Sequence, residues 1–454
     1  MTQASLDDAG VAKAKAAEAA RFGPGYRRWL LFLLALIYTS NFVDRQIFST
    51  LIQPIKKDLH LTDTELGMLS GLTFAVFYTA LGIPIARLIE RKSRIVVMTV
   101  CIAVWSAMTA SCGLAQNFLQ LAISRVGVGV GEAGCLPAAN SLVSDHFPRE
   151  KRATALGVFT LGIPIGSMIG AVAGGWIAQH MSWRLAFFMV GAPGLLIALL
   201  TILTLREPPR GLVEGGKAPP EAPPLTAVIR RLFSRPAALW VCVAAGVSAA
   251  GTYGTITFAA AYFTRRFGFD FTQAGLAAGL ISGVGAGVSV ISGGLLTDRI
   301  ARMDVRAYAW VPIVGLVLAV PLYLVGFTRA DAGAALMFLV AAAAVQQLYL
   351  APTFAVANNV AEARMRATSV SLMSFVWNLI GLGFGPLIVG SLSDRFGHAL
   401  MGGSDPLSLC RKAACADASA TGLQYALIAV TGVFLLGAAL YAVASLRLKR
   451  DLGD

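Results

Sequence analysis

The nine residues from Ala86 to Arg94 read ARLIERKSR, and the nine from Gly294 to Arg302 read GLLTDRIAR. Each copy begins with a small residue and continues to an acid followed directly by arginine, with a second arginine three residues further on. Both copies end a long apolar run, and they lie 208 positions apart; Gly67 matches Gly275 at the same spacing. We therefore expect two related halves in parallel orientation, an arrangement found in membrane transporters.

The composition is that of a protein embedded in a membrane. Of the 454 residues 56% are hydrophobic and only 13% are charged, and the mean hydropathy is +0.70. A soluble chain of this size needs far more charge on its surface. An apolar run of about 20 residues crosses a bilayer. Such runs predict an all-α membrane protein with twelve helices in two six-helix halves related by a pseudo-two-fold axis, at 29–53, 64–89, 95–115, 118–145, 152–179, 184–205, 237–264, 273–297, 307–327, 332–361, 366–392 and 421–446.

The charges predict the domain boundaries and the orientation. Most of the 37 Lys and Arg residues fall in the N-terminal arm, the even-numbered loops, the central linker and the C-terminal tail. A positive bias of this kind marks the cytoplasmic side, so we expect both termini in the cytoplasm of a bacterial-type inner membrane. It also accounts for the net charge of +13 without nucleic acid. The predicted parts are an arm at 1–28, bundles at 29–205 and 237–447, a Pro- and Gly-rich linker at 206–236 and a tail at 448–454.

The acid of the repeated loop suggests a contact that holds helices together. An acid at a helix end can accept charge-assisted hydrogen bonds and face the positive N-terminus of another helix. Such a contact can latch the cytoplasmic side; the alternative is an ordinary solvated loop. A related stretch, GSLSDR at 390–395, predicts a similar latch on the opposite face. The predicted cytoplasmic latch consists of Glu90, Arg91, Arg94, Asp298, Arg299 and Arg302.

Glycines recur at four-residue spacing in the fifth and eleventh predicted helices. Spacing of this kind lets helices approach closely and bend, and we expect it to mediate contact between the halves. The residues concerned are Gly162, Gly166, Gly170, Gly381 and Gly385.

Only four ionisable residues fall well inside the predicted helices: Asp44, Arg45, Arg125 and Glu132. Ionisable groups at membrane depth are costly and therefore mark candidate functional sites. Seven residues separate Arg125 from Glu132, so both lie on nearly the same helix face. Burial favours the protonated form of a carboxyl and a nearby arginine favours the ionised form. A cavity between the first and fourth helices could thus couple transport to protons; the alternative is a permanent ion-pair network that joins helices.

At these motifs the sequence resembles the major facilitator superfamily. Its members carry Gly-x-Leu-x-Asp-Arg-x-x-x-Arg in the repeated loop, which Gly294, Asp298 and Arg299 fit, whereas the first copy has Ala86 and Glu90. The stretches NFVDR at 41–45 and RVGVGVGEAG at 125–134 resemble the Spinster branch in particular.

This resemblance assigns proton coupling to Asp44 and Glu132. It implies that Arg45, with Arg125, links the proton to an anionic head group. Spinster relatives in animals export lysophospholipids and sphingosine-1-phosphate, which implies an amphiphilic anion as substrate.

The second half is chemically different at depth. Positions matching Asp44 and Glu132 are neutral and fall near Thr252 and Gln347. Hydrogen-bonding groups with aromatic faces suit an amphiphile, although each could instead serve packing. The predicted cavity residues are Asn41, Tyr253, Phe258, Gln347, Tyr349, Asn358, Trp377 and Asn378.

No catalytic or metal-binding pattern stands out. The four histidines fall at helix ends or loops, and no His-Glu-x-x-His occurs, which argues against an intramembrane enzyme. We expect a monomeric, proton-coupled, alternating-access transporter of a lipid-like amphiphile, with no cofactor except the proton. The alternatives are a drug or organic-anion transporter and an uncoupled facilitator. Cys410 and Cys415, in one outer loop, fit either a disulfide or free thiols.

Overall fold

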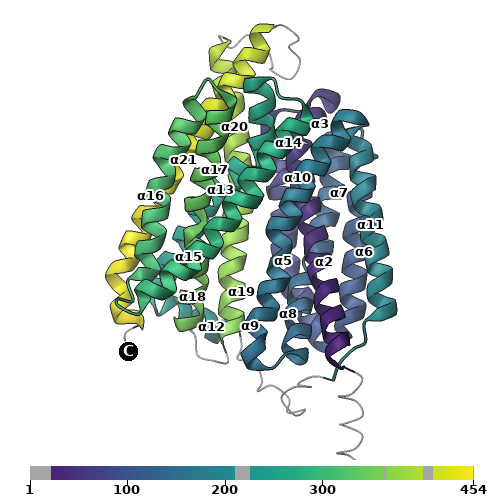
Figure 1. Ribbon diagram of the computed structural model, residues 1–454, viewed down its shortest axis with the longest axis vertical. Coiled ribbons are helices and arrows are strands. Elements are labelled where there is room, and N and C mark those ends of the chain that lie inside the picture. Colours follow the sequence, from purple (N-terminus) through teal and green to yellow (C-terminus); the bar gives the residue numbers. More distant parts are fainter. Residues whose placement is uncertain (1–21, 210–224, 361–364, 402–412, 453–454) are drawn as a thin grey trace, which may run out of the picture.

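The chain folds as a bundle of long helices. The computed structural model describes residues 22–209, 225–360, 365–401 and 413–452, and this part of the chain contains helices and turns but no strand. Figure 1 shows two groups of helices side by side, purple to teal in the first half and green to yellow in the second. The first half holds α2 Pro24–Thr50, α3 Ile52–Leu59, α4 Asp63–Ser70, α5 Leu72–Arg91, α6 Arg94–Cys112, α7 Phe118–Glu132, α8 Cys135–His146, α9 Arg149–Thr160, α10 Gly162–His180 and α11 Trp183–Thr204.

The second half repeats this plan. Its elements are α12 Leu225–Phe233, α13 Pro236–Phe267, α14 Phe271–Gly279, η2 Leu280–Gly285, α15 Ala286–Ala301, α16 Ala307–Thr328, α17 Ala332–Gln346, η3 Gln347–Tyr349, α18 Leu350–Val360, α19 Arg366–Trp377, η4 Asn378–Phe384, α20 Gly385–Leu400 and α21 Ala413–Leu452.

The membrane-spanning helices match the expectation closely. Eleven helical segments of the described chain are long and apolar enough to cross a bilayer. The remaining predicted helix, 118–145, consists of α7 and α8, which a short turn at Ala133 and Gly134 separates. Both predicted ionisable residues of this helix, Arg125 and Glu132, belong to α7.

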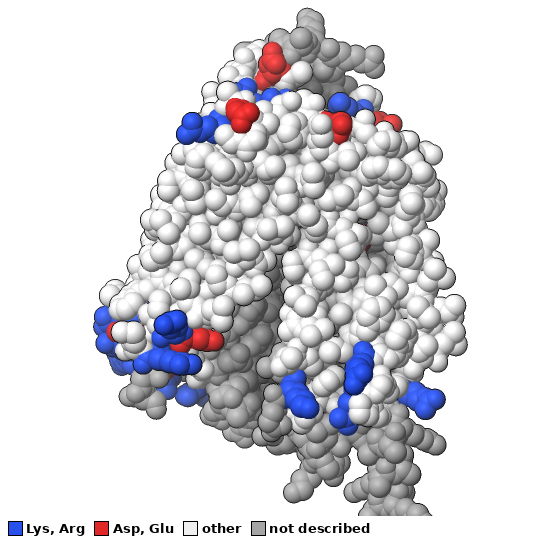
Figure 2. Space-filling view, in the orientation of Figure 1, with Lys and Arg blue, Asp and Glu red and all other residues white. Residues whose placement is uncertain are grey.

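Two ends of the molecule can be told apart by the chain direction. Helix α2 begins and α21 ends at the lower end of Figure 1, which we call the terminal face. The opposite end, where α3 lies, is called the far face. Figure 2 shows a groove between the halves that runs down to the terminal face.

The most extensive contacts between the halves form a pseudo-symmetric pair, and α13 also packs on α2. Helix α4 of the first half packs on α20 of the second, and α14 of the second packs on α10 of the first. The two matched glycines lie in these contacts. A Cβ on Gly67 would lie 2.4 Å from the Pro386 carbonyl oxygen, and one on Gly275 would lie 2.3 Å from that of Ala171. Only glycine permits this backbone approach at either place.

The expectation for the four-residue glycine repeats was wrong. A Cβ on Gly166 would lie 2.4 Å from the Thr39 carbonyl oxygen of α2, and one on Gly385 would lie 2.3 Å from the Ala250 carbonyl oxygen of α13. These repeats therefore pack helices within each half. Contact between the halves uses a different face of α10, at Gly175, where a Cβ would lie 2.2 Å from the Phe271 carbonyl oxygen.

Each of the four helices in this pair of contacts adjoins an irregular turn. In the first half, α4 and α5 are separated at Gly71 and α9 and α10 at Leu161. At the equivalent places of the second half lie the π-helical turns η2 and η4. Irregular turns of this kind are common where helices bend in function.

Two boundaries differ from the prediction. The linker contains a short helix, α12, and the last helix continues to Leu452, so most of the predicted tail is helical. Hydropathy missed both because α12 is short and amphipathic and the end of α21 is charged. Cys415 takes part in a disulfide, whereas the expectation for Cys410 lies outside the described residues.

Candidate functional site

A buried ion pair joins the first and fourth predicted helices. Arg45 of α2 donates from Nε to Oε2 of Glu132 on α7 over 2.7 Å. The Glu132 side chain is fully buried, while that of Arg45 keeps 15% of its surface exposed. The carboxylate of this ion pair is thus shielded from solvent, while its guanidinium remains partly accessible.

The other two buried ionisable groups lack such a partner. Both carboxyl oxygens of Asp44 are buried with no hydrogen-bond partner in the described structure, and so are Oε1 of Glu132 and Nη1 of Arg125. Arg125 donates from Nε to the Leu69 carbonyl oxygen at 3.3 Å. An unpartnered buried charge is expensive. Asp44 is therefore the carboxyl of the site that has no direct hydrogen-bond partner in the described structure.

Aromatic rings frame both guanidinium groups. The Arg45 guanidinium carbon lies 4.8 Å from the ring centroid of Phe74 and 4.9 Å from that of Tyr78. That of Arg125 lies 4.6 Å from the Phe48 ring and 5.3 Å from the same Phe74 ring. Cation–π contacts of this kind stabilise a cation where water is scarce. They also fix the direction in which each guanidinium points.

The second half holds a neutral pair at the equivalent place. Gln346 of α17 donates to the Thr252 hydroxyl of α13, and Tyr323 donates to Gln346 Oε1 over 2.6 Å. The buried member of this pair is Gln346, whereas the predicted Gln347 is half-buried. All its hydrogen bonds join groups of the second half.

The predicted cavity residues fall into two sets. Tyr253 and Trp377 are half-buried, with ring centroids 5.7 Å apart, and Tyr253 packs against the core of the first half. Gln347 is also half-buried. The other described residues of this set are buried: Asn41, Tyr349 and Asn378 by their neighbours, and Phe258 within the packed core of the second half. The Asn358 side chain lies outside the described structure.

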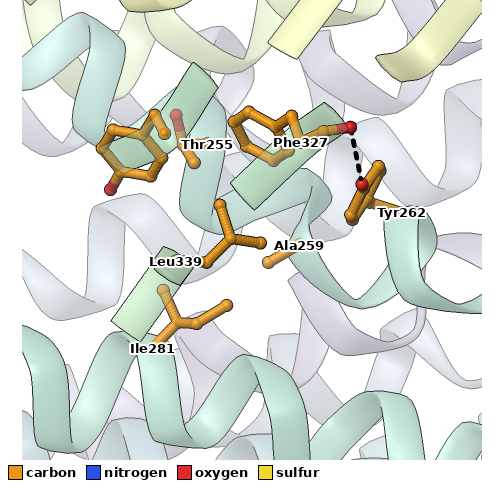
Figure 3. A pocket seen from close by; sticks show the side chains of 7 residues that line it. Thr255, Ala259, Tyr262, Ile281, Phe327 and Leu339 are labelled. Carbon is orange, nitrogen blue, oxygen red and sulfur yellow. Dashed lines mark hydrogen bonds between the residues drawn. The ribbon is translucent and has the colours of Figure 1, made fainter. Parts of the chain in front are cut away.

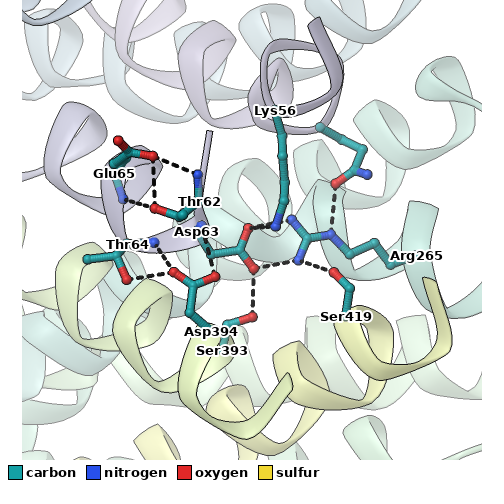
Figure 4. A network of polar contacts seen from close by, with 10 residues as sticks. Lys56, Thr62, Asp63, Thr64, Glu65, Arg265, Ser393, Asp394 and Ser419 are labelled. Atoms are coloured by element: carbon teal, nitrogen blue, oxygen red, sulfur yellow. Dashed lines mark hydrogen bonds and ion pairs between the residues drawn. The ribbon is translucent and has the colours of Figure 1, made fainter. Parts of the chain in front are cut away.

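The sequence analysis missed a polar network that bridges the halves at the far face (Figure 4). Arg265 of α13 donates to both oxygens of Asp63 over 2.6 and 2.7 Å, and Lys56 of α3 donates to Asp63 over 2.6 Å. Ser393 of α20 also donates to Asp63, over 2.6 Å. Asp63 is 1% exposed. One buried carboxylate thus holds donors from both halves.

Next to this network lies the contact expected from GSLSDR. Asp394 of α20 accepts hydrogen bonds from the backbone N–H groups of Asp63 and Thr64, over 3.1 and 2.8 Å, and from the Thr64 hydroxyl over 2.6 Å. These N–H groups belong to the first turn of α4. An acid from one half therefore faces the positive N-terminus of a helix in the other. The expected far-face contact is confirmed by these bonds.

The predicted cytoplasmic latch residues make no contact between halves among the described side chains. Arg94 is buried and bonds to Glu207 over 2.6 Å and to Asp145, so it ties the start of the linker to its own half. The remaining described members, Arg91, Asp298, Arg299 and Arg302, are exposed, and the Glu90 side chain lies outside the described structure. The latch stays a prediction for a state in which the terminal face is closed.

A small void lies inside the second half (Figure 3). It measures about 10 Å³ and is lined by apolar side chains with Thr255 and Tyr262 among them. The Tyr262 hydroxyl donates to the Phe327 carbonyl oxygen over 3.2 Å. This volume holds at most one water molecule, so the void is no substrate site.

Two parallel halves around a buried charged site form the architecture of a secondary transporter. The sequence profile of the Major Facilitator Superfamily matches residues 34–386. The chain belongs to this superfamily and to its Spinster-like branch.

Three known proteins illustrate the relationship. An MFS-type efflux pump of Mycolicibacterium smegmatis is 33% identical over 434 residues, which cover 95% of this chain and 96% of the pump. Protein spinster homolog 1 of Xenopus tropicalis is 25% identical over 94% of this chain and 83% of its own. The solved structure of a bacterial homologue of the human lysosomal transporter Spinster, described as inward-facing and unoccupied, has a TM-score of 0.86 and 32% identity, covering 95% of this chain and 99% of that one.

Proposed function

We propose that this transporter is proton-coupled and moves a lipid-like amphiphilic anion by alternating access. The observation that carries this proposal is the Arg45–Glu132 ion pair beside the unpartnered carboxyl of Asp44. Protonating a buried carboxyl removes a charge that the site leaves partly uncompensated. A site of this kind can take up a proton from one side and release it to the other.

The coupling step follows from the ion pair. When Glu132 accepts a proton on its carboxylate, it loses its charge, and Arg45 is released from its partner. Because the Arg45 side chain is still 15% exposed, its guanidinium can then bind an anionic head group. Loss of that proton restores the pair and displaces the head group. Arg125 keeps the site positive throughout.

The far-face network suits the role of an outer gate. It closes one side through Asp63, Arg265 and Asp394. At the terminal face, no ion pair of the described latch residues joins the two halves. We take the terminal face as cytoplasmic because Lys and Arg favour that side. On this assignment the chain faces inward, as the solved bacterial Spinster homologue is described to do. The irregular turns at Gly71, Leu161, η2 and η4 are where the helices would bend.

The proposed substrate class is inferred from the aromatic residues Tyr253 and Trp377 and from the related transporters. Tyr253 and Trp377 of the second half are half-buried, with their rings in contact, and such apolar ring surface suits an acyl or ring system next to an anionic group. A drug-like substrate is the second candidate, since a relative at 33% identity is an efflux pump. A thermal-shift panel of lysolipids, sphingoid phosphates, organic anions, drugs and sugars separates the two. Stabilisation by sugars alone would contradict both.

Proton coupling is tested in proteoliposomes with an imposed pH gradient. Asp44→Asn and Glu132→Gln should abolish gradient-driven flux while the purified proteins keep their folded melting transition. Asp58→Asn is the matched control, because Asp58 is an exposed acid bound to Arg184 and Trp183 of its own half. Gradient dependence equal to wild type in either site variant removes that residue from the coupling role.

A further inference from the structure

A basic pocket lies at the terminal face of the second half, away from the central site. It measures about 370 Å³ and lies between the start of α13 and the end of α21. Figure 2 shows basic side chains, with acidic ones beside them, at the corner of the molecule where α21 ends. The lining residues are Ser234, Arg235, Pro236, Arg447, Arg450 and Asp451.

The charges of this pocket are unbalanced. Asp451 is already engaged, because its Oδ2 accepts from the Ala237 N–H over 2.8 Å. Arg235 donates to the Asp451 carbonyl oxygen over 3.1 Å, which orders its guanidinium but does not neutralise it. Arg447 and Arg450 are exposed, and neither has an ion-pair partner among the described residues. Three arginines against one aspartate leave a net positive pocket that an anion can fill.

The surroundings identify the kind of anion. Because α21 runs toward the terminal face, Val443 and Leu446 lie one helical turn deeper than Arg447 and Arg450, on the same sides of the helix. They are 40% and 77% exposed. On α13, Trp240 lies one turn deeper than Pro236 and is 38% exposed. Tryptophan at this depth marks the boundary between headgroups and acyl chains.

We propose that this pocket binds the headgroup of an anionic phospholipid. The phosphate lies between Arg235, Arg447 and Arg450, and the acyl chains run along the exposed apolar side chains of α13 and α21. Basic pockets at membrane-surface level recognise anionic lipids in this way. A free phosphate ion would use the arginines but gain nothing from Val443, Leu446 or Trp240.

The test measures lipid binding to the purified full-length protein. Native mass spectrometry and melting temperatures are recorded with phosphatidylglycerol, with phosphatidylcholine and with inorganic phosphate. We expect retained phosphatidylglycerol and a saturable rise in melting temperature with that lipid alone. In Arg447→Gln/Arg450→Gln the affinity should fall about 25-fold, since each basic residue near an anionic surface contributes about fivefold. An equal effect of inorganic phosphate, or equal retention of both lipids by wild type, overturns the proposal.

Two further variants make the result specific. Arg28→Gln is the matched control, because Arg28 is exposed at the terminal face of the other half and also adjoins an interfacial tryptophan, Trp29. Its phosphatidylglycerol affinity should equal that of wild type. Arg45→Ala should also keep this affinity, since Arg45 belongs to the central site; a loss there would mean that the lipid occupies the transport site instead. If the double variant does not fold, the wild-type comparison of the two lipids still decides.

Discussion

The buried carboxylate of Asp63 is predicted to hold the far face closed. It accepts two hydrogen bonds from Arg265 of the other half and one from Ser393, in addition to the bond from Lys56 of its own half. Replacing it by Asn keeps the shape of the side chain and removes its charge. The two cations then face each other across the contact between the halves.

The size of this effect follows from the two cations, Lys56 and Arg265, that Asp63→Asn leaves without a carboxylate. Burial and the nearby Arg265 lower the pKa of Lys56, which indicates that the two cations already repel each other with Asp63 in place. Breaking a buried ion pair by removing one partner costs about 3–5 kcal/mol. Opening the far face returns Lys56 and Arg265 to water, so most of this cost favours the open state. About 3 kcal/mol corresponds to a shift of about 100-fold in the conformational equilibrium.

Spin-label distances across the far face measure this shift. Labels at Lys57 and Arg266, both exposed there and on opposite halves, should move from a short to a longer distance in Asp63→Asn. The control is Asp58→Asn, which removes an acid of the same segment whose partners are all in the first half. It should leave the distances unchanged. Identical distance distributions for wild type and Asp63→Asn would refute the gating role of the network.

Three further outcomes are expected. Arg45→Ala leaves Glu132 buried without its cation and should lower the free energy of unfolding by about 3–5 kcal/mol at pH 8. The loss should be smaller at pH 5, where the carboxyl can take up a proton. Equal losses at the two pH values would contradict the ion pair. Burial opposes ionisation of Glu207, but hydrogen bonds from Ser93 and Arg94 outweigh it and lower the pKa of its carboxyl. Its stabilising effect is therefore fully present well above the ordinary pKa of 4.5 and is lost as the pH falls below 4.5 through the lower pKa of the folded protein. The melting temperatures of wild type and Glu207→Gln should therefore differ at pH 7 and converge only in that acidic range. Gly275→Ala places a methyl 2.3 Å from a backbone oxygen of the other half and should destabilise the far-face contact by about 1–3 kcal/mol, whereas Gly432→Ala, which meets nothing within 4 Å, should not.

The helices and their division into halves could be predicted because hydropathy and repetition are local properties of the sequence. The matched glycines show how far repetition extends. Gly67 and Gly275 occupy equivalent places in the contact between the halves, although their spacing says nothing about which helix each one meets. The repeats around Gly166 were assigned to the wrong neighbour for this reason. Helix α10 packs on both α2 and α14, and small-residue spacing does not distinguish the two faces.

The central site was accessible to sequence reasoning, whereas the far-face network was not. Asp44 and Glu132 stand out because an acid inside an apolar run is rare. Lys56, Asp63 and Arg265 lie at helix ends, where charges are normally solvated, so each one has an ordinary explanation. The available signal was the position of Asp63 four residues before Gly67. A carboxylate beside a close helix contact has little room for water, and folding then brings a cation to it.

On the proposed function, the distribution of charges between the halves separates coupling from gating. Asp44, Arg45, Arg125 and Glu132 all belong to the first half, and the equivalent place in the second holds the neutral Thr252–Gln346 pair. If the halves rock as rigid bodies, distances among these four charges change little, so their interactions respond to protonation and substrate instead of to the rocking itself. The Asp63–Arg265 pair joins the two halves and must break whenever the far face opens. A proton or head group that alters the first set shifts the balance against the second, which is how a local change of charge can drive the movement of an entire half.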